Sequence, residues 1–418
     1  MCALPRRPRL VAGLLLGALA VSACGAATEQ EPSAAQSGGV DLSDFDSVQK
    51  AAQGQTVDWY MFGGDERLNT YVNGYVKDAM AERGVTLNQV KVTDTVEAVN
   101  KVLGEVQAGR TDDGTVDMIW INGENFKTGK QADLWYCGWD KVLSSAEFVD
   151  FDDPLVANDF GEPVEGCEAA WNRAQSVLVY DSAKVPAEAT TSLAGLESWS
   201  KSNPGRFAYP APPDFTGSLV TKTFFYDTAG YDEDIFGAFD EDVYTKYAKP
   251  TWDRLNALES SLYRGGETYP ASGPDVAKLY ADGEIDAYIS YGAGDIGSEV
   301  SDGNYPESTR SAVFKDGTIG NVNFLSIPVN SPDKAGAMVL ADLLQSPEAQ
   351  FEKFVNGPGY YPGIDTSTTG EFEEKFADID TPPSQLPFED QIVNGQPELQ
   401  AEWLTRLEED WVTNVSQK

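Results

Sequence analysis

The sequence predicts an α/β fold, and three features of its first third support this class. Apolar runs typical of buried strands occur at 56–62, 87–92 and 116–121. Between them, residues 68–83 and 97–108 carry apolar side chains at intervals of three and four, as in an amphipathic helix. Gly84 and Gly109 directly follow these two segments, where helix ends favour glycine. Strands and helices that alternate at this spacing predict parallel strand pairing.

The rest of the chain contains further segments of both kinds. Strand character occurs at 171–180, 285–291 and 322–327, and helical patterns occur within 219–265 and at 276–280, 334–344 and 397–411. A long irregular tract, 135–170, separates the two parts and contains several aromatic and acidic residues. The length of 418 residues is enough for two or three domains with sizeable cores.

The stretch 116–126 is the strongest local candidate for a binding site. Its strand ends directly at Asn122, Gly123, Glu124 and Asn125, which place two amides and a carboxylate past the carboxyl end of the strand. In open α/β sheets, ligands bind at this edge. The alternative is an ordinary turn in which an asparagine caps the next helix.

Residues 1–23 have the pattern of a secretory signal. Three arginines precede an apolar run of 12 residues, 10–21, which is too short to span a membrane. The small residues before Cys24 resemble the lipobox of bacterial lipoproteins, in which this cysteine carries lipid. The alternative is an ordinary secreted protein. Residues 24–54 are polar and lack periodicity, which predicts a flexible tether at the outer face of the cell membrane.

Cys137 and Cys167 remain once Cys2 and Cys24 are assigned to the signal and the lipid. A pair of cysteines in an oxidising compartment predicts a disulfide. The alternative is two unpaired, buried thiols.

The composition narrows the function. The formal net charge is −37, which disfavours nucleic acid as a partner and favours a cationic ligand at long range, although it can equally serve solubility. The chain has no histidine, so serine–histidine and cysteine–histidine catalysis and histidine-based zinc sites are excluded. We therefore expect no metal, no cofactor and no catalytic residue.

Two further loops follow predicted elements. Pro212-Pro-Asp-Phe-Thr-Gly-Ser218 leads into a helix, whose first N–H groups can bind a polar ligand or be capped by Asp214 or Thr216. Residues 292–297 match G-x-G-x-x-G after a strand, but 298–310 is broken by Gly, Pro and Ser. A dinucleotide site needs a complete βαβ unit there, so a glycine-lined ligand loop is the better interpretation.

Several motifs resemble one family. Those of the first half are Trp59-Tyr60, Gly63-Gly64, Thr93-Asp94, Trp120-Ile-Asn-Gly-Glu-Asn-Phe126, Asp159-Phe-Gly161, Arg173-Ala-Gln175, Asn203-Pro-Gly-Arg206 and Pro212-Pro-Asp-Phe-Thr-Gly217. Together they resemble the YnjB-type group of extracellular solute-binding proteins of ABC importers. The chain departs from that pattern at Phe62, at Ala170-Trp-Asn172 and at both Cys137 and Cys167.

The resemblance implies a two-lobed, type II periplasmic-binding-protein fold with mixed, mostly parallel sheets. Lobe one would hold 55–172 and 330–418, and lobe two would lie within 173–329, with hinge strands near 173–180 and 320–328. Such a protein is a monomer that captures a small solute between its lobes and delivers it to the permease. The resemblance implies a thiamine-like or other organic cation, and relatives take polyamines, anions or ferric ion.

The ligand residues expected from these loops combine aromatic, acidic and glycine positions. They are Trp59, Phe62, Gly63, Gly64, Asp65, Asn122, Glu124, Asn125, Trp171, Arg173, Asp214, Phe215, Thr216 and Tyr291. Aromatic walls with one or two acids suit an organic cation. Arg173 can hold an anion or pair with a neighbouring acid, and Tyr360-Tyr361 can bind ferric ion or form a core turn.

Two other classes stay open from the residues alone. One is a secreted hydrolase that uses paired carboxylates, although no local signature marks such a pair. The other is an extracellular scaffold lipoprotein, which would not need polar loops at strand ends.

Overall fold

The computed structural model describes Asp41, residues 44–292 and residues 294–417, and it confirms an α/β fold. The expected signal and Cys24 lie outside the described residues. The strands are β1 (Thr56–Phe62), β2 (Thr86–Val92), β3 (Met118–Ile121), β4 (Asn158–Asp159), β5 (Glu162–Pro163), β6 (Glu168–Asp181), β7 (Ala287–Tyr291), β8 (Thr309–Ala312), β9 (Thr318–Ser326), β10 (Tyr361–Pro362) and β11 (Gly395–Gln396).

The helices are distributed along the whole described chain. They are α1 (Phe45–Ala51), α2 (Glu66–Tyr71), α3 (Lys77–Glu82), α4 (Val96–Gln107), α5 (Glu124–Gln131), α6 (Pro154–Ala157), α7 (Leu193–Ser202), α8 (Phe215–Ala229), α9 (Glu241–Glu259), α10 (Gly273–Ala281), α11 (Ile296–Ser301), α12 (Lys334–Gln345), α13 (Pro347–Val355), α14 (Glu371–Ala377), α15 (Phe388–Gln391) and α16 (Ala401–Trp411). A π-helical turn, Val72–Val76, joins α2 to α3, so the helix predicted at 68–83 is continuous from 66 to 82.

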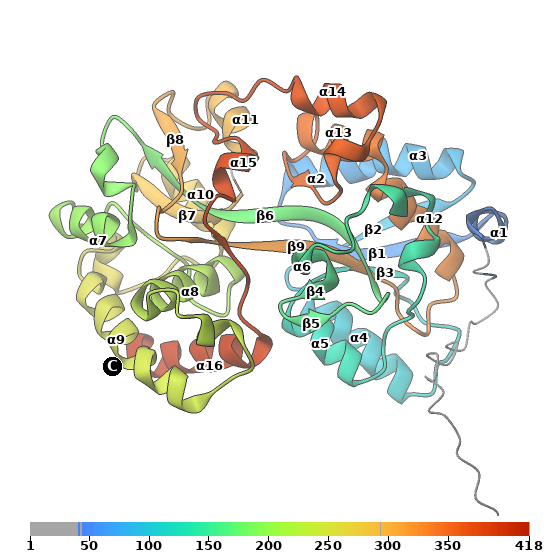
Figure 1. Ribbon diagram of the computed structural model, residues 1–418, viewed down its shortest axis with the longest axis horizontal. Helices are drawn as coiled ribbons and strands as arrows, with labels where there is room; N and C mark the ends of the chain where they lie inside the picture. Colours follow the sequence, from blue (N-terminus) through green and yellow to red (C-terminus); the bar gives the residue numbers. More distant parts are fainter. Residues whose placement is uncertain (1–40, 42–43, 293, 418) are drawn as a thin grey trace, which may run out of the picture. The chain divides into compact units, whose positions relative to one another are not determined.

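The long strands β6 and β9 form the centre of the main sheet. They pair antiparallel from Glu168↔Ser326 to Gln175↔Gly320, with an irregularity between Ala170 and Asn172. In Figure 1 they lie side by side and join two groups of strands and helices. We call β1, β2, β3 and β10, with the segments packed on them, the β1 side, and β7, β8 and β11, with theirs, the β7 side.

The β1 side contains the elements that the sequence predicts best. β1 pairs parallel with both β2 and β3, as the alternating strands and helices predict. Apolar side chains of these strands, α1, α12 and α13 share one core around Trp59 and Trp171, which are both 0% exposed. β3 then pairs antiparallel with β9, so the β1 side is attached to the central strands through its middle.

The β7 side is attached to the same two strands further along. β7 and β8 pair antiparallel with the second half of β6, and β11 pairs parallel with the start of β9. The remaining pairings of the described strands in this sheet are antiparallel. The expectation of mostly parallel pairing is therefore wrong, because the two central strands run in opposite directions and each pairs with strands of both sides.

The last helix lies on the β7 side. Trp403, Leu407 and Trp411 of α16 belong to the core that contains α8 and α9, and the rings of Trp403 and Phe225 are 6.0 Å apart. The structure differs here from the expectation that 330–418 as a whole joins the first lobe: α12 and α13 do so, and α16 does not. Its amphipathic pattern predicts a buried face without indicating which core covers that face.

A helix also lies where a flexible tether is expected. The Asp44 side chain caps α1 by accepting a hydrogen bond from the Ser47 N–H at 2.8 Å. Val48 is 0% exposed and packs in the same core as α12. The tether predicted over 24–54 is therefore wrong for 45–51.

Cys137 and Cys167 form a disulfide, as the sequence predicts. The bond crosses the irregular tract, in which the Gly138 N–H also donates to the Gly166 carbonyl at 2.8 Å. The tract contains short elements, α6, β4 and β5, so the disulfide restrains a region with little regular structure of its own.

Removing the disulfide should destabilise the protein. The two cysteines are 30 residues apart, and a loop of this length contributes about 3.5 kcal/mol to the free energy of unfolding in the chain-entropy model. We expect the double variant Cys137→Ser, Cys167→Ser to show this loss in urea unfolding. Dithiothreitol should destabilise the wild type and leave the double variant unchanged. A double variant as stable as the oxidised wild type would contradict the prediction.

Candidate functional site

Three side chains in the first turns of α8 share one face of the helix. The Asp214 carboxylate caps the helix by accepting hydrogen bonds from the N–H groups of Thr216 and Gly217, at 3.0 and 3.1 Å. Phe215, Ser218 and Lys222 follow at spacings of three and four, so they lie on one face. Phe215 is 42% exposed, whereas Ser218 and Lys222 are buried.

The Lys222 ammonium lies inside a cage of one carboxylate and three rings. Its Nζ is 2.5 Å from Glu398 Oε2 and donates to the Tyr291 hydroxyl at 3.2 Å. The centroids of the Phe160, Phe215 and Tyr291 rings are 5.3, 5.9 and 5.9 Å from Nζ. The Lys222 and Glu398 side chains are 1% and 2% exposed. We call these five residues the lysine cage.

A row of amides on β9 connects the lysine cage to β3. Asn321 and Asn323 lie two residues apart and therefore on one face of the strand. Asn321 donates to Glu398 Oε1 at 3.1 Å, and Asn323 donates to Asn321 at 3.0 Å. The Trp120 indole N–H and the Asn122 amide both donate to Asn323 Oδ1, at 2.9 and 3.4 Å. The row thus links the two sides of the sheet.

The turn at Gly123 brings the β1 side against the cage. Gly123 has φ 63° and ψ −133°, a conformation that favours glycine, and a Cβ there would lie 2.9 Å from the Phe160 ring. Its N–H donates to the buried Asp159 carboxylate at 2.7 Å. The backbone of 122–125 is therefore held on the turn that carries Phe160 to Lys222.

Two carboxylates near the cage have raised pKa values. Burial is the main cause for Glu124, whose pKa lies above its ordinary value; Lys222 opposes this shift, and the charges of Asp94 and Glu398 add to it. Burial likewise raises the pKa of Glu408 to about 7, opposed by a hydrogen bond from Ser218 and assisted by the charges of Glu124 and Asp94.

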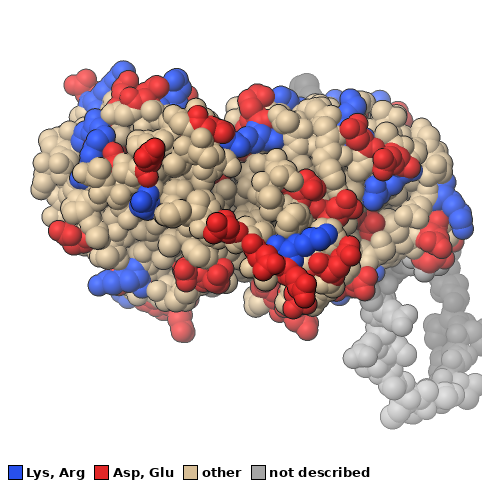
Figure 2. Space-filling view, turned by 90° about the horizontal axis from the view of Figure 1, so that it is seen from above, with Lys and Arg blue, Asp and Glu red and all other residues tan. Residues whose placement is uncertain are grey.

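Glu124 is solvent-exposed beside the lysine cage, and burial by the surrounding protein still raises its pKa. Among the described residues, neither Glu124 nor Glu408 forms an ion pair, although the charge of Lys222 acts on both. Asp and Glu are also spread over the whole visible face in Figure 2, in keeping with the net charge of −37.

A second pair of acids lies at the other end of the Trp120 ring. Asp65 caps α2 and accepts a hydrogen bond from the Tyr360 hydroxyl at 2.7 Å. The rings of Tyr360 and Trp120 are 6.1 Å apart. Burial, with the charge of Asp65 second, raises the pKa of Asp295 to about 7.

The structure brings several expected ligand residues into this region. Phe215 and Tyr291 stack at 4.7 Å, Asn122 joins the amide row, and Glu124 interacts electrostatically with Lys222. Asn125 is half-buried beside Glu124, with its amide 3.5 Å from that carboxylate. These contacts bring the loops of β3, α8 and β7 together beside the lysine cage.

Other expected ligand residues have structural partners instead. Trp59 and Trp171 are 0% exposed and pack edge to face at 5.2 Å, so the expectation that their side chains contact a solute is wrong. Arg173 pairs with Asp153 at 2.6 Å. Thr216 packs against Gly273, where a Cβ would lie 2.5 Å from its hydroxyl.

The loop after β1 is held closely by its neighbours. The Gly63 N–H donates to the Val92 carbonyl at 3.1 Å, and a Cβ on Gly63 would lie 2.6 Å from the Lys91 side chain. A Cβ on Gly64 would lie 2.3 Å from the ring of Phe62, which is half-buried. The glycines therefore let this loop fold back on β2 and on Phe62.

Sequence reasoning missed much of the site. The missed residues are Asp94, Phe160, Lys222, Asn321, Asn323, Glu398 and Glu408. Asp94 and Phe160 lie in two of the family motifs, Thr93-Asp94 and Asp159-Phe-Gly161, without being marked as site residues. The asparagines offered a local signal, since two polar residues with a spacing of two interrupt the otherwise apolar strand predicted at 322–327 and the residues before it.

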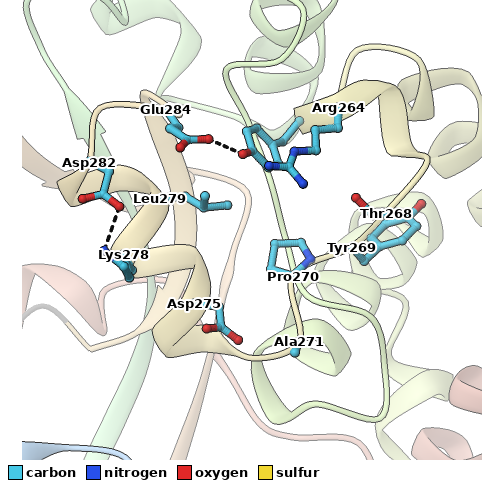
Figure 3. A pocket seen from close by; sticks show the side chains of 11 residues that line it. Arg264, Thr268, Tyr269, Pro270, Ala271, Asp275, Lys278, Leu279, Asp282 and Glu284 are labelled. Atoms are coloured by element: carbon cyan, nitrogen blue, oxygen red, sulfur yellow. Dashed lines mark hydrogen bonds and ion pairs between the residues drawn. The ribbon is translucent and has the colours of Figure 1, made fainter.

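Two cavities lie away from the lysine cage. One, of about 360 Å³, is lined by the 263–271 loop and α10, and Figure 3 shows its Lys278 paired with Asp282. In the same cavity, the Tyr263 hydroxyl donates a hydrogen bond to Glu284. The other, of about 390 Å³, lies beside the disulfide and includes Glu168. Within the described part of the chain, there is no group of three or more acidic or cysteine side chains placed to hold a metal. No helix among the described residues is long and apolar enough to cross a membrane.

The chain was compared with known proteins. Residues 74–378 match the family model described as bacterial extracellular solute-binding protein. The protein YnjB of Escherichia coli (strain K12) is 31% identical over 370 residues, which cover 88% of this chain and 93% of that protein. The chain therefore belongs to the bacterial extracellular solute-binding proteins, a family of binding proteins rather than enzymes.

Solved structures show the same fold. The spermidine/putrescine ABC transporter substrate-binding protein PotD of Streptococcus pneumoniae has a TM-score of 0.60 at 13% identity, covering 86% of this chain and 98% of that one. The periplasmic binding protein AfuA of Actinobacillus pleuropneumoniae has a TM-score of 0.59 at 11% identity, covering 87% and 99%. The fold is the two-lobed periplasmic-binding-protein fold.

Glu408→Gln should make the stability of the protein less dependent on pH. The folded-state pKa of about 7 lies above the ordinary value of 4.5, so the folded chain holds this proton more tightly between these values. The free energy of unfolding that protonated Glu408 contributes is fully present below about pH 4.5 and is lost as pH rises through about 7.

We therefore expect Glu408→Gln to gain on the order of 2 kcal/mol relative to wild type between about pH 5 and pH 8, from the size of the shift. Thermal unfolding across this range measures the gain. Glu409→Gln, at an exposed neighbouring position, is the control and should not reproduce this gain. A Glu408→Gln variant whose stability relative to wild type is the same at pH 5 and pH 8 would contradict the prediction.

Proposed function

We propose that this protein is the solute-binding component of an ABC importer and that it captures a small organic cation beside the lysine cage. The observation that carries the proposal is the pair Glu124 and Glu408, two acids that interact electrostatically with each other and with Lys222 and have raised pKa values. Glu408 accepts a hydrogen bond from Ser218, on the face of α8 that also carries the exposed ring of Phe215. A cation placed there relieves the repulsion between the two carboxylates.

The proposed solute position beside Glu124, Glu408 and Phe215, which we call the recess, offers two attractions to one solute. A charge-assisted hydrogen bond to a carboxylate contributes about 1.5–3 kcal/mol. A cation over an aromatic face adds about 0.5–2 kcal/mol. Phe215 is exposed and stacks on Tyr291, so it can support a flat or bulky cation such as a thiamine-like ring. The family resemblance of the sequence supports the same class of solute.

Contacts between the two sides support closure around the solute. Arg67 on α2 pairs with Glu299 on α11 at 3.2 Å and also with Asp302. Lys127 on α5 pairs with Glu402 on α16. β6 and β9 continue through both sides, so we propose that they act as the hinge.

Delivery and anchoring complete the proposal. PotD, which shares the fold, is the substrate-binding protein of an ABC transporter, and this likeness supports a permease as the partner of this monomeric chain. The signal pattern of 1–23 and the lipobox at Cys24 support a lipid-anchored protein at the outer face of the cell membrane. Both segments lie outside the described residues, so this part rests on sequence alone.

The contacts favour a cation over the other solutes considered. Arg173 and Lys222, two cations close to the expected loops, are paired with Asp153 and Glu398, and these ion pairs disfavour an anion as the solute. The two tyrosines considered for ferric ion have partners within the protein. Tyr360 donates a hydrogen bond to Asp65, and the Tyr361 hydroxyl accepts hydrogen bonds from Gln385 and Gln391 while its side chain is 3% exposed. These contacts disfavour ferric ion as the solute.

A panel of solutes tests the proposal. Thiamine-like cations, polyamines, anions and neutral sugars are added separately to the purified protein, and thermal unfolding is followed. A true ligand at 100 times its dissociation constant should stabilise the protein by about 2.7 kcal/mol. We expect stabilisation by an organic cation; if only an anion or a sugar stabilises the protein, the proposed solute class is wrong.

The double variant Glu124→Gln, Glu408→Gln locates the site. It should weaken binding of that cation by about 100-fold, since two charge-assisted contacts are lost. The control, Glu373→Gln with Glu409→Gln, changes the net charge equally at two exposed positions and should bind normally. Equal losses in both variants would indicate a long-range charge effect rather than this site.

Affinity should also depend on pH. A bound cation lowers the pKa of Glu408 from about 7, so binding releases a proton when the acid starts protonated. Calorimetric titrations should therefore show affinity that rises with pH and levels off above about 7. Glu408→Gln should flatten this profile, and a profile unchanged in that variant would rule out Glu408 as the titrating group.

A further inference from the structure

The lysine cage is built like a binding site for an ammonium group. It contains a carboxylate, a hydroxyl acceptor and three aromatic rings around one nitrogen. Carboxylates and aromatic faces are the groups that proteins use to bind organic ammonium ligands. In this chain the ammonium that occupies the cage belongs to the protein itself.

The cage is formed by both sides of the sheet. Phe160 follows β4 on the β1 side, whereas Lys222, Phe215 and Tyr291 belong to α8 and β7. Glu398 comes from the segment between β11 and α16. Lys222 therefore meets a wall of the opposite side through its contact with Phe160.

Stability alone does not explain this arrangement. A buried ion pair gains little over apolar residues of similar size, because removing two charges from water costs about as much as their attraction returns. The Lys222 and Glu398 side chains are almost fully buried, and Glu398 further accepts from Tyr291 and Asn321. The polar neighbourhood is thus organised around a single positive charge.

We propose that Lys222 is a built-in occupant of an ammonium-binding site, which keeps small primary amines out of the cage and leaves Glu124 and Glu408 to bind the solute. The assignment of Lys222 as the occupant of the cage stands on the contacts of Lys222. The statement that Glu124 and Glu408 bind the solute rests on the proposed function. The chemical class that the emptied cage would take is a short, unbranched primary alkylammonium ion.

Shortening Lys222 tests the cage directly. Lys222→Ala removes Cγ, Cδ, Cε and Nζ, which together have the size and charge of n-propylammonium. Millimolar n-propylammonium should therefore raise the melting temperature of Lys222→Ala by about 3 °C, the size expected for a ligand near 100 times its dissociation constant in a chain of this length. n-Propanol has the same shape without the charge and should have no such effect.

Two controls keep the readout specific. Lys222→Met fills the same space without charge, so n-propylammonium should stabilise neither this variant nor the wild type beyond sodium chloride at equal ionic strength. In Lys222→Ala, Glu398→Gln, the carboxylate that holds the ammonium is absent, and stabilisation by the amine should disappear. This double variant also folds without an unpaired buried charge, in case Lys222→Ala alone does not.

The outcomes separate the two proposals. Equal stabilisation of wild type, Lys222→Met and Lys222→Ala by the amine would overturn the cage assignment. A folded Lys222→Ala variant whose melting temperature does not rise with the amine would also overturn it. The same holds if Lys222→Ala is unfolded and the amine does not restore its fold, while the double variant Lys222→Ala, Glu398→Gln folds. Stabilisation of Lys222→Ala alone supports the assignment. If the solute panel then fails on wild type, the proposed function falls and the cage assignment stands.

Discussion

The antiparallel pairing of β6 with β9 is the constraint on which the rest of the structure depends. Each strand is long enough to pair with neighbours of both sides, so the backbone hydrogen bonds of one ladder determine the relative position of two cores. The same pairing places Asn321 and Asn323 between β3 and the cage. Since strand side chains alternate between faces, a shift of one residue would turn both amides away from the recess.

The buried pair of Lys222 and Glu398 sets the electrostatics of the recess. Glu398 pairs with Lys222 at close range, so Lys222 only partly offsets the charges of Glu124 and Glu408. Burial then raises the pKa values of both glutamates. A protein with a large negative net charge thus also gathers acids without ion-pair partners near the partly exposed Phe215. This combination distinguishes the recess from the two cavities, whose charged groups largely pair with each other or lie beside the disulfide.

Much of the β1 side could be predicted from sequence, since local patterns specify it. Periodicity predicted β1, β2, β3 and the helices between them, and the spacing of these elements predicted their parallel pairing. The loop at Asn122 and Glu124 was predicted from its place after a buried strand. The same reasoning placed Trp59 and Trp171 in the ligand site, because an aromatic residue near a loop has the same local pattern whether it faces a core or a recess. The edge-to-face packing of Trp59 against Trp171 in the structure places both rings in the core.

The sequence by itself determined the class of fold, the Cys137–Cys167 bond and the position of the Asn122–Asn125 loop, because each depends on local periodicity, spacing or redox chemistry. The tertiary structure decided the site around Lys222. Glu398 and Lys222 are 176 residues apart, and Phe160 and Glu408 come from still other segments. No local pattern marks a lysine in an apolar helix as caged, since its surroundings are supplied by distant chain. For the same reason, the sequence does not specify whether α16 packs on the β1 side or the β7 side. An amphipathic face fits any apolar core, and only the completed sheet specifies which core is near.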